Sequence, residues 1–250
     1  MILVLTYHKV LRSPEDNTEF YSTTAEHLER HLGILARSGL EPIDPRKLAE
    51  NEPGKSSSYL LSFDDGTRDH EELVLPLLTR FNQSAIFFVP TSKLNREGYL
   101  SEEGLRRLGV SGQSIGSHSH DHQRMDVLTE EDIRVQFQLS FNIIERITGT
   151  RPTMFAPPGG FMNARVRRTA IEAGVKLIRT MRWGYNKHPD LTGLCCVPVN
   201  RYMTEGEFHH VLEFRSQAGT YLLKQAAKRL LPTNVYASLR DALIGWLRSK

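Results

Sequence analysis

The chain alternates between short apolar runs with the character of buried strands and amphipathic runs with the character of helices, and this alternation limits its fold most. Strand-like runs occupy residues 2–7, 59–63 and 85–89. Between them, residues 24–38 and 69–81 carry leucines at helical spacing. Strands and helices that follow each other in this way predict a parallel sheet covered by helices.

The same alternation continues through the second half of the chain. Ser101 and Asn163 are expected to cap short helices, and Thr129 opens a long helix that Gly149 ends. Further short strands are expected at residues 114–117, 153–156, 175–178 and 194–199. A chain of 250 residues with this pattern suits one closed or nearly closed barrel.

The pattern changes near the C-terminus, where only helical runs remain and Pro232 separates two of them. We therefore predict an α/β barrel over residues 1–215 and an added helical extension over residues 216–250. Basic residues alternate with leucines in that extension, so a helical layer packed on the barrel and a face that contacts an anionic membrane are both open interpretations.

Charge and cysteine content exclude some classes of function. The formal net charge is only +3 and the basic residues form no long run, which argues against nucleic acid as a partner. Cys195 and Cys196 are adjacent, so on a strand they point to opposite faces and neither bridge nor chelate one ion together. The apolar start of the chain is too short for a signal peptide or a membrane span, so we expect a cytoplasmic protein.

Two acidic side chains directly follow a predicted strand in the run LLSFDDG, which contains Asp64, Asp65 and Gly66. The carboxyl ends of barrel strands form the catalytic edge of such folds. Neighbouring carboxylates repel each other, so a cation or a shared proton is expected to neutralise one of them. The alternative is an aspartate-rich turn in which Asp69 caps the next helix.

Three histidines follow another predicted strand in the run SIGSHSHDHQRM: His118, His120 and His122. Histidines four residues apart can reach one metal ion, although a histidine-rich surface loop is the alternative. Combined with Asp65, the pair His118 and His122 makes a set of one carboxylate and two imidazoles, which leaves positions open for water and substrate.

These motifs resemble the first two signatures of the NodB-like polysaccharide deacetylases of carbohydrate esterase family 4, Ser/Thr-Phe-Asp-Asp-Gly and His-Ser/Thr-x-x-His. The resemblance implies a distorted (β/α)7-type barrel in which Asp64 is the general base. It also implies that Asp65, His118 and His122 hold a divalent metal, whereas His120 lies at a variable position between the ligands. Zinc is our first expectation for such a site, and cobalt, nickel or iron also fit these ligands.

The third family signature is similar to the run FAPPGG at residues 155–160. Ala156 occupies the position of an arginine that orients the base in many members, and Gly159 occupies that of an aromatic residue. The resemblance implies that Pro158 and Gly159 line the substrate groove and that the backbone N–H of Gly159 can bind an oxyanion.

Two arginines near Trp183, namely Arg179 and Arg182, are candidates to replace the missing orienting arginine, and Arg182 is also a candidate for substrate binding. Trp183 is similar to a tryptophan that walls the family's pocket, and a half-buried core aromatic is the alternative.

The fifth family signature, a Leu-x-His that supplies the general acid, is not found near residues 197–201. His188 and His8 are the candidates for that role, and a strand-end histidine bonded to backbone is the alternative for His8. The opening Tyr7-His8 also resembles a subset of the family that acts on poly-N-acetylglucosamine and surface polysaccharides.

Together these features predict a metal-dependent hydrolase that removes the N-acetyl group from an amino sugar in a saccharide or in a lipid-linked or nucleotide-linked precursor. One alternative keeps the fold but cleaves another C–N amide or an acetyl ester. A second alternative is a carbohydrate-binding relative without turnover, and the retention of Asp64 argues against it.

Overall fold

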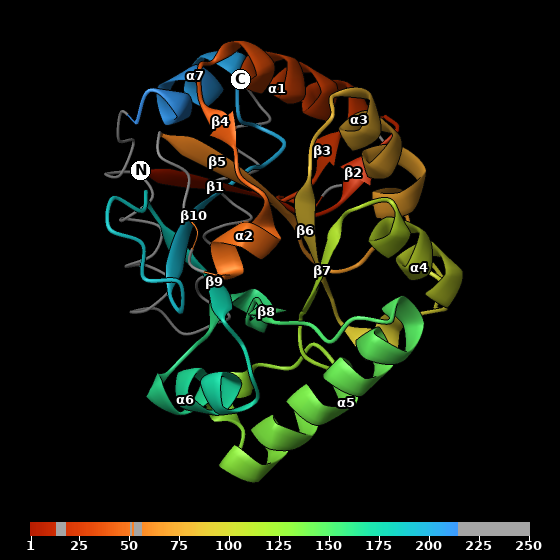
Figure 1. Cartoon of the computed structure of the whole chain (residues 1–250). Coiled ribbons are helices and arrows are strands. Elements are labelled where there is room, and N and C mark those ends of the chain that lie inside the picture. Colours follow the sequence, from red (N-terminus) through yellow and green to blue (C-terminus); the bar gives the residue numbers. More distant parts are fainter. Residues whose placement is uncertain (14–18, 51, 53–56, 215–250) are drawn as a thin grey trace. The chain divides into compact units, whose positions relative to one another are not determined.

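Seven parallel strands form a closed barrel in the computed structural model, which describes residues 1–13, 19–50, 52 and 57–214 (Figure 1). Strand β1 pairs with both β5 and β10, and this double pairing closes the ring. The barrel strands are β1 (Ile2–Tyr7), β5 (Ser58–Phe63), β6 (Ala85–Val89), β7 (Ser114–Ser117), β8 (Met154–Phe155), β9 (Leu177–Trp183) and β10 (Leu194–Pro198). The predicted (β/α)7-type barrel is therefore confirmed.

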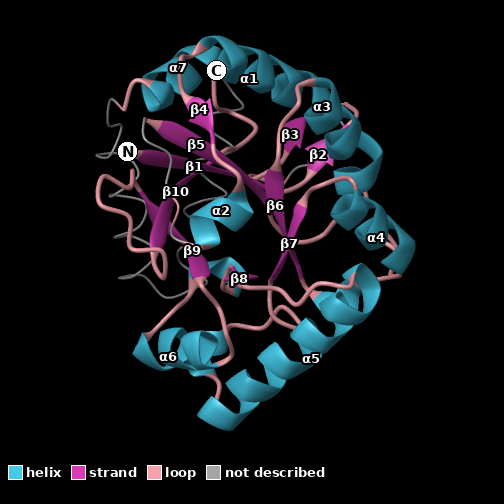
Figure 2. Cartoon of the chain, viewed as in Figure 1, coloured by secondary structure: helices cyan, strands magenta, loops and turns pink. Residues whose placement is uncertain are grey.

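Helices surround the outside of this barrel (Figure 2). They are α1 (Ala25–Arg37), α3 (Leu75–Arg80), α4 (Glu102–Val110), α5 (Glu130–Thr148), α6 (Ala164–Glu172) and α7 (Glu205–Leu212). Thr24, Ser101, Thr129 and Asn163 accept hydrogen bonds from the first turns of α1, α4, α5 and α6. The caps at Ser101, Thr129 and Asn163 were expected from the sequence. A loop without a helix joins β9 to β10, which makes the barrel irregular.

Side chains alternate along each strand between the inside of the barrel and the layer beneath the helices. The inner cluster contains Ile2, Val4, Leu60, Ile86, Phe88, Met154, Leu177, Leu194 and Cys196. On β1, β5 and β7 this alternation continues toward the end of the strand, where Thr6, Ser62 and Gly116 face inward. His8, Asp64 and His118 each come two residues later and are therefore on the inward side as well. The fold thus brings these three side chains to the same end of the barrel.

The opposite end of the barrel is closed by α2 (Pro45–Ala49), which lies across the middle of the ring in Figure 1. Leu48 and Ala49 of this helix join the inner cluster, together with Ile43. The short strand β4 (Glu41–Pro42) leads into α2 and pairs with the first residues of β5. Only the end at which the strands finish is left for a site.

Several elements were not predicted from the sequence. They are β4, α2, α7 and the two-stranded pair of β2 (Val10–Leu11) and β3 (Thr23–Thr24), all of them too short to show a clear hydrophobic period. The predicted helix at residues 69–81 is divided into a π-helical turn at His70–Val74 and α3. The predicted boundary at residue 215 stays a prediction, because residues 215–250 lie outside the described part of the chain.

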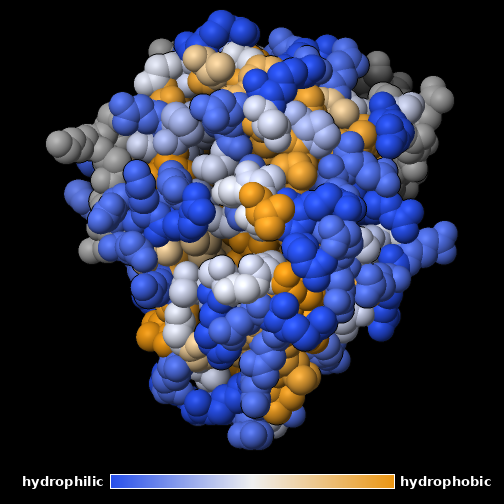
Figure 3. Space-filling model, turned by 45° about the vertical axis from the view of Figure 1, so that its right-hand side comes forward, coloured by the Kyte–Doolittle hydropathy of each residue, from blue (hydrophilic) through white to orange (hydrophobic). Residues whose placement is uncertain are grey.

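The face of the molecule in Figure 3 is largely hydrophilic, with hydrophobic residues in scattered patches. The exposed large apolar side chains include Val110, Val127 and Ile171, and single apolar residues on a surface are ordinary. Among the described helices, none combines the length and apolar character that a membrane span requires. The two cysteines are unpaired, and Cys196 is buried, whereas Cys195 is half-buried.

Gly116 provides a test of the packing inside the barrel. A Cβ at this position would lie 2.6 Å from the Phe88 ring and 3.1 Å from the carbonyl oxygen of Met154. We expect Gly116→Ala to lower the free energy of unfolding in urea by about 1–3 kcal/mol, because the inner cluster has no room for the methyl group.

The matched control is Gly109→Ala in α4, where a Cβ would lie 3.7 Å from Thr148 in ordinary contact. That change is expected to raise the free energy of unfolding by about 0.5–1 kcal/mol, because alanine favours the helix. Equal effects of the two substitutions would contradict the packing described for the barrel interior.

Candidate metal centre and active site

Asp65, His118 and His122 converge at the open end of the barrel, and one ligand atom from each lies within 4.8 Å of the other two. The Nε2 atoms of His118 and His122 lie 3.5 Å and 3.1 Å from Asp65 Oδ1. The His118 side chain is only 2% exposed, whereas those of His122 and Asp65 are 37% and 34% exposed. The predicted ligand set is therefore brought together, buried on one side and open to solvent on the other.

The His118 ring is fixed in the tautomer that a metal ligand needs. Its Nδ1 lies 2.6 Å from the carbonyl oxygen of Ala156. A carbonyl oxygen only accepts, so Nδ1 carries a proton, and Nε2, on the side of Asp65, is the ring nitrogen that can bind a metal. One carboxylate and two imidazoles held in this way fit a divalent cation such as zinc.

The backbone around these side chains is unusual. Asp65, Ser119 and His122 have positive φ values of 73°, 63° and 65°. Residues other than glycine rarely adopt this region, and such conformations gather at functional sites. The strain is a structural sign of function that the sequence does not show.

A glutamine on α5 holds the loop between the two histidine ligands. Gln136 Oε1 accepts hydrogen bonds from the backbone N–H groups of His120 and Asp121 at 2.9 Å and 3.1 Å, and its Nε2 donates to Asp121 Oδ2 at 3.0 Å. His120 Nδ1 lies 2.8 Å from Thr91 Oγ1, so this ring is bonded outside the ligand group. We did not predict Gln136, although a polar residue on the buried face of α5 is a sequence signal for such a role.

Asp64 forms a buried ion pair with Arg179 of β9. The two side chains are 3% and 0% exposed, and the guanidinium also lies 5.2 Å from the centre of the Phe88 ring. Of the two arginine candidates, Arg179 therefore contacts Asp64, whereas Arg182 donates to the carbonyl of Gly193 and is itself exposed. The predicted contact of Arg182 with substrate stays a prediction.

Neighbouring charges keep both carboxyl groups ionised. Burial alone would raise the pKa of Asp64, but the positive charge of Arg179, assisted by the neighbouring imidazoles of His118 and His8, outweighs burial and holds that pKa below its usual value. The pKa of Asp65 lies well below its usual value, because hydrogen bonds from His118 and His122 outweigh its burial.

His8 lies beside Asp64, with 3.7 Å between His8 Nε2 and Asp64 Oδ2. Its ring stacks on Tyr21 at 5.1 Å between centroids and 19° between planes. Burial lowers the pKa of His8, and the nearby charges of Asp64 and Asp65 only partly oppose this effect. His8 is therefore placed to exchange a proton at the site.

His188, the other candidate for the general acid, is exposed and lies far from Asp64 along the fold. It follows Asn186, whose backbone pairs with Ile2 at the first residue of β1, whereas His8 follows the last residue of that strand. A strand of six residues spans about 20 Å. The structure therefore does not bring His188 to the end of β1 that carries His8, and the role of His188 as the general acid stays a prediction.

The segment after β8 presents backbone rather than side chains. Gly159 is exposed and has φ 62°, and no atom of the described residues accepts its N–H. Pro158 beside it is buried. A Cβ on Gly159 would lie 3.0 Å from the ring of Phe161, so the absence of a side chain leaves room for that ring.

Trp183 packs against the layer beneath the helices rather than the inner cluster. Its ring lies 5.4 Å from that of Tyr185, with 69° between their planes. This environment supports the alternative of a half-buried core aromatic, and the predicted contact of Trp183 with a sugar stays a prediction.

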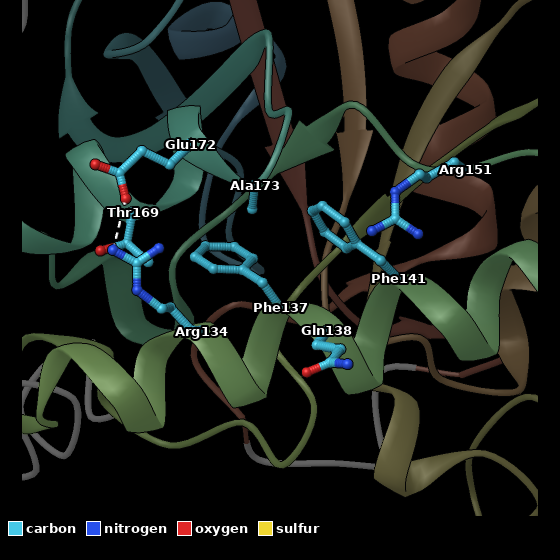
Figure 4. Close-up of a pocket in the computed structure, with 8 residues that line it drawn as sticks. All are labelled: Arg134, Phe137, Gln138, Phe141, Arg151, Thr169, Glu172 and Ala173. Carbon is cyan, nitrogen blue, oxygen red and sulfur yellow. Dashed lines mark ion pairs between the residues drawn. The ribbon is translucent and has the colours of Figure 1, made fainter.

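A separate cavity of about 210 Å³ lies between α5 and α6 (Figure 4). Phe137 and Phe141, which belong to a buried apolar cluster, line this cavity, and the ion pair of Arg134 with Glu172 lies at one side of it. Sites for small-molecule ligands usually measure about 300–1,000 Å³. The cavity contains none of the residues of the candidate site.

Comparisons with known proteins agree with this geometry. The sequence profile of the polysaccharide deacetylase family matches residues 51–178. A peptidoglycan-N-acetylglucosamine deacetylase of Bacillus cereus is 28% identical over 157 residues, which cover 62% of this chain and 69% of that protein. YxkH of Bacillus subtilis, whose name assigns it provisionally to the polysaccharide deacetylases, is 22% identical over 183 residues, which cover 70% of this chain and 62% of that protein.

Among solved structures, the Streptococcus pyogenes deacetylase PplD in complex with acetate superposes with a TM-score of 0.76 at 18% identity. The match covers 86% of this chain and 98% of that one. At this level of identity the similarity shows a shared fold.

The ligand cluster predicts a metal-dependent gain in stability. We expect Zn²⁺ at about a thousand times its Kd to stabilise the metal-free protein by about 4 kcal/mol, seen as a rise in Tm. Asp65→Asn should abolish most of this rise. His120→Ala is the matched control and should keep it, because His120 is bonded to Thr91; equal losses in both variants would refute the assignment of ligands.

The ion pair predicts a pH-dependent loss of stability in Arg179→Met. Without the guanidinium, Asp64 is a buried unpaired charge, so we expect a loss of about 3–5 kcal/mol at neutral pH. A depressed carboxyl pKa stabilises the wild type above the unfolded pKa and ceases to do so as the pH falls through the folded value. In the variant burial raises the pKa of Asp64 above its ordinary value of about 4, so acid removes the unpaired charge, and the difference between the two proteins should begin to shrink above about pH 4 and continue to shrink as the pH falls further.

Adding Asp64→Asn to Arg179→Met is the control, because the double variant has no buried charge to compensate. It should recover part of the loss in urea unfolding at neutral pH. A loss that is independent of pH and of Asp64 would show that Arg179 acts only through packing.

Proposed function

Because the chain belongs to the polysaccharide deacetylase family, we propose that it is a metal-dependent hydrolase that removes the N-acetyl group from an amino sugar of a saccharide or glycan precursor. The observation that carries this proposal is an ionised carboxylate, Asp64, beside a cluster of one aspartate and two histidines. Of the two adjacent aspartates, metal binding needs only Asp65, whereas hydrolysis also needs Asp64 as a base.

Asp65, His118 and His122 would hold the metal. A divalent cation at this position supplies Lewis-acid polarisation of the acetyl carbonyl and lowers the pKa of water. Asp64 accepts a proton from the attacking water, and its ion pair with Arg179 keeps it oriented and ionised. The unpartnered N–H of Gly159 is available to donate to the oxyanion that develops on the acetyl oxygen.

His8 supplies the proton for the leaving amine in this proposal. The C–N bond breaks, its electron pair stays on nitrogen, and nitrogen takes the proton from His8. Water gives its hydroxyl to the acetyl carbon and one proton to Asp64. That proton passes through His8 to the nitrogen, so acetic acid and a free amino sugar result and both side chains return to their starting states. The 3.7 Å between His8 Nε2 and Asp64 Oδ2 supports exchange of protons between these two groups.

The substrate class is drawn from the relatives and from the openness of the site. The Bacillus cereus relative is named for N-acetylglucosamine in peptidoglycan, and two of the three ligand side chains here are about a third exposed. We propose an N-acetylglucosamine-containing glycan or its lipid-linked or nucleotide-linked precursor, with zinc as the metal. The cytoplasmic location stays a prediction, as does membrane contact through residues 216–250, which lie outside the described residues.

The test is acetate release from N-acetylglucosamine oligomers by the zinc-loaded protein. Asp64→Asn should lower kcat by about 10²–10⁴-fold, because the general base is lost, while bound zinc stays at the wild-type ratio. His188→Ala is the control and should keep both activity and metal. Full metal occupancy with no acetate from any N-acetylated glycan would contradict the proposed function.

A further inference from the structure

The backbone that carries His8 is held by the loop that also carries the two aspartates. Regular pairing of β1 with β5 ends at Tyr7 and Phe63, so His8 lies beyond the ladder. His70 Nε2 lies 3.0 Å from the carbonyl oxygen of His8, and it donates because a carbonyl only accepts. One residue earlier, Asp69 Oδ2 accepts the N–H of Val10 at 2.7 Å.

His70 is itself fixed by its surroundings. It is fully buried, and its ring lies 5.6 Å from that of Phe63 at 67° and 5.4 Å from that of Phe87 at 57°. It is the first residue of the π-helical turn His70–Val74, and such turns are frequent at functional sites. A histidine locked between two aromatic rings can hold the carbonyl of His8 in one place.

The hydrogen bond from His70 to the His8 carbonyl affects the position of the His8 imidazole. Its ring has Tyr21 on one face and Asp64 at 3.7 Å. The carbonyls of Tyr7 and Lys9, on either side of His8, accept the backbone N–H groups of Asp64 and Thr23 at 3.0 Å each, but these bonds do not involve the His8 carbonyl. A displacement of about 1 Å at a reacting group can cost about 10²-fold in rate. The hydrogen bond that His70 donates to the His8 carbonyl, and the one that Asp69 accepts from Val10, therefore help to set the distance from His8 to Asp64.

We propose that His70, together with Asp69, is a positioning residue for proton transfer by His8. The inference rests on the role of His8 in the proposed function. His70 would not touch the substrate, and its effect would reach the reaction through the carbonyl of His8. Its loss should therefore affect reactions that need the proton from His8 and spare those that do not.

The leaving group separates these two cases. An amine must be protonated before it departs, whereas 4-nitrophenolate leaves without a proton at neutral pH. The experiment compares N-acetylglucosamine oligomers with 4-nitrophenyl acetate on the zinc-loaded protein. His70→Phe keeps an aromatic ring but removes the donor, and we expect kcat on the oligomers to fall about 10- to 100-fold with KM and the ester rate within about twofold of wild type.

His70→Gln keeps an N–H at a similar reach and should restore most of the kcat on the oligomers. His8→Ala sets the reference and should show the same split between the two substrates. Asp69→Ala tests the second hydrogen bond and should show the split in weaker form. It also supplies the test if His70→Phe fails to fold.

The matched control is His31→Phe, because His31 is another buried histidine stacked on an aromatic ring, 3.9 Å from Phe208. It should lower Tm without separating the two substrates. Equal losses on both substrates in His70→Phe, or no recovery in His70→Gln, would overturn the inference while the wild type still releases acetate. A wild type that releases no acetate would instead overturn the proposed function on which the inference rests.

Discussion

The buried pairing of Asp64 with Arg179 is the interaction on which the rest of the site depends. Burying either charge without its partner would lower the stability of the barrel, and the attraction between the two charges offsets this desolvation cost. Because the two residues come from β5 and β9, they meet only when the ring of strands is closed. The same closure that buries the apolar inner cluster therefore produces an ionised base at the open end.

The metal ligands depend on a different kind of support. Asp65 and His122 sit in backbone conformations that cost energy, and surrounding hydrogen bonds must hold them there. Gln136 supports the histidine loop from α5, and the carbonyl of Ala156 fixes the His118 ring. The inner cluster of the barrel contains none of these residues with positive φ.

Much of this arrangement could be predicted from the sequence, because the period of apolar residues reports strands and helices directly. The strands at residues 2–7 and 85–89, and the caps Ser101 and Thr129, follow from local chemistry. The motifs also indicated the three clustered ligand candidates. The choice between Arg179 and Arg182 depended on how a bulged strand places alternate side chains, which is a tertiary property. His188 was a candidate because it follows the Trp183 loop in the sequence, but the pairing of nearby Asn186 with Ile2 at the start of β1 is a tertiary contact that the sequence does not show.

The source of the arginine beside Asp64 has a consequence for how such sites are recognised in a sequence. Ala156 stands where similar proteins carry the orienting arginine, yet a guanidinium reaches Asp64 from the next strand. A chain without an arginine at either position would leave the buried carboxylate without a partner, at a cost of about 3–5 kcal/mol. What the site needs is a positive charge beside Asp64, whichever strand supplies it, and a sequence motif that fixes the position of the arginine along the chain does not detect that.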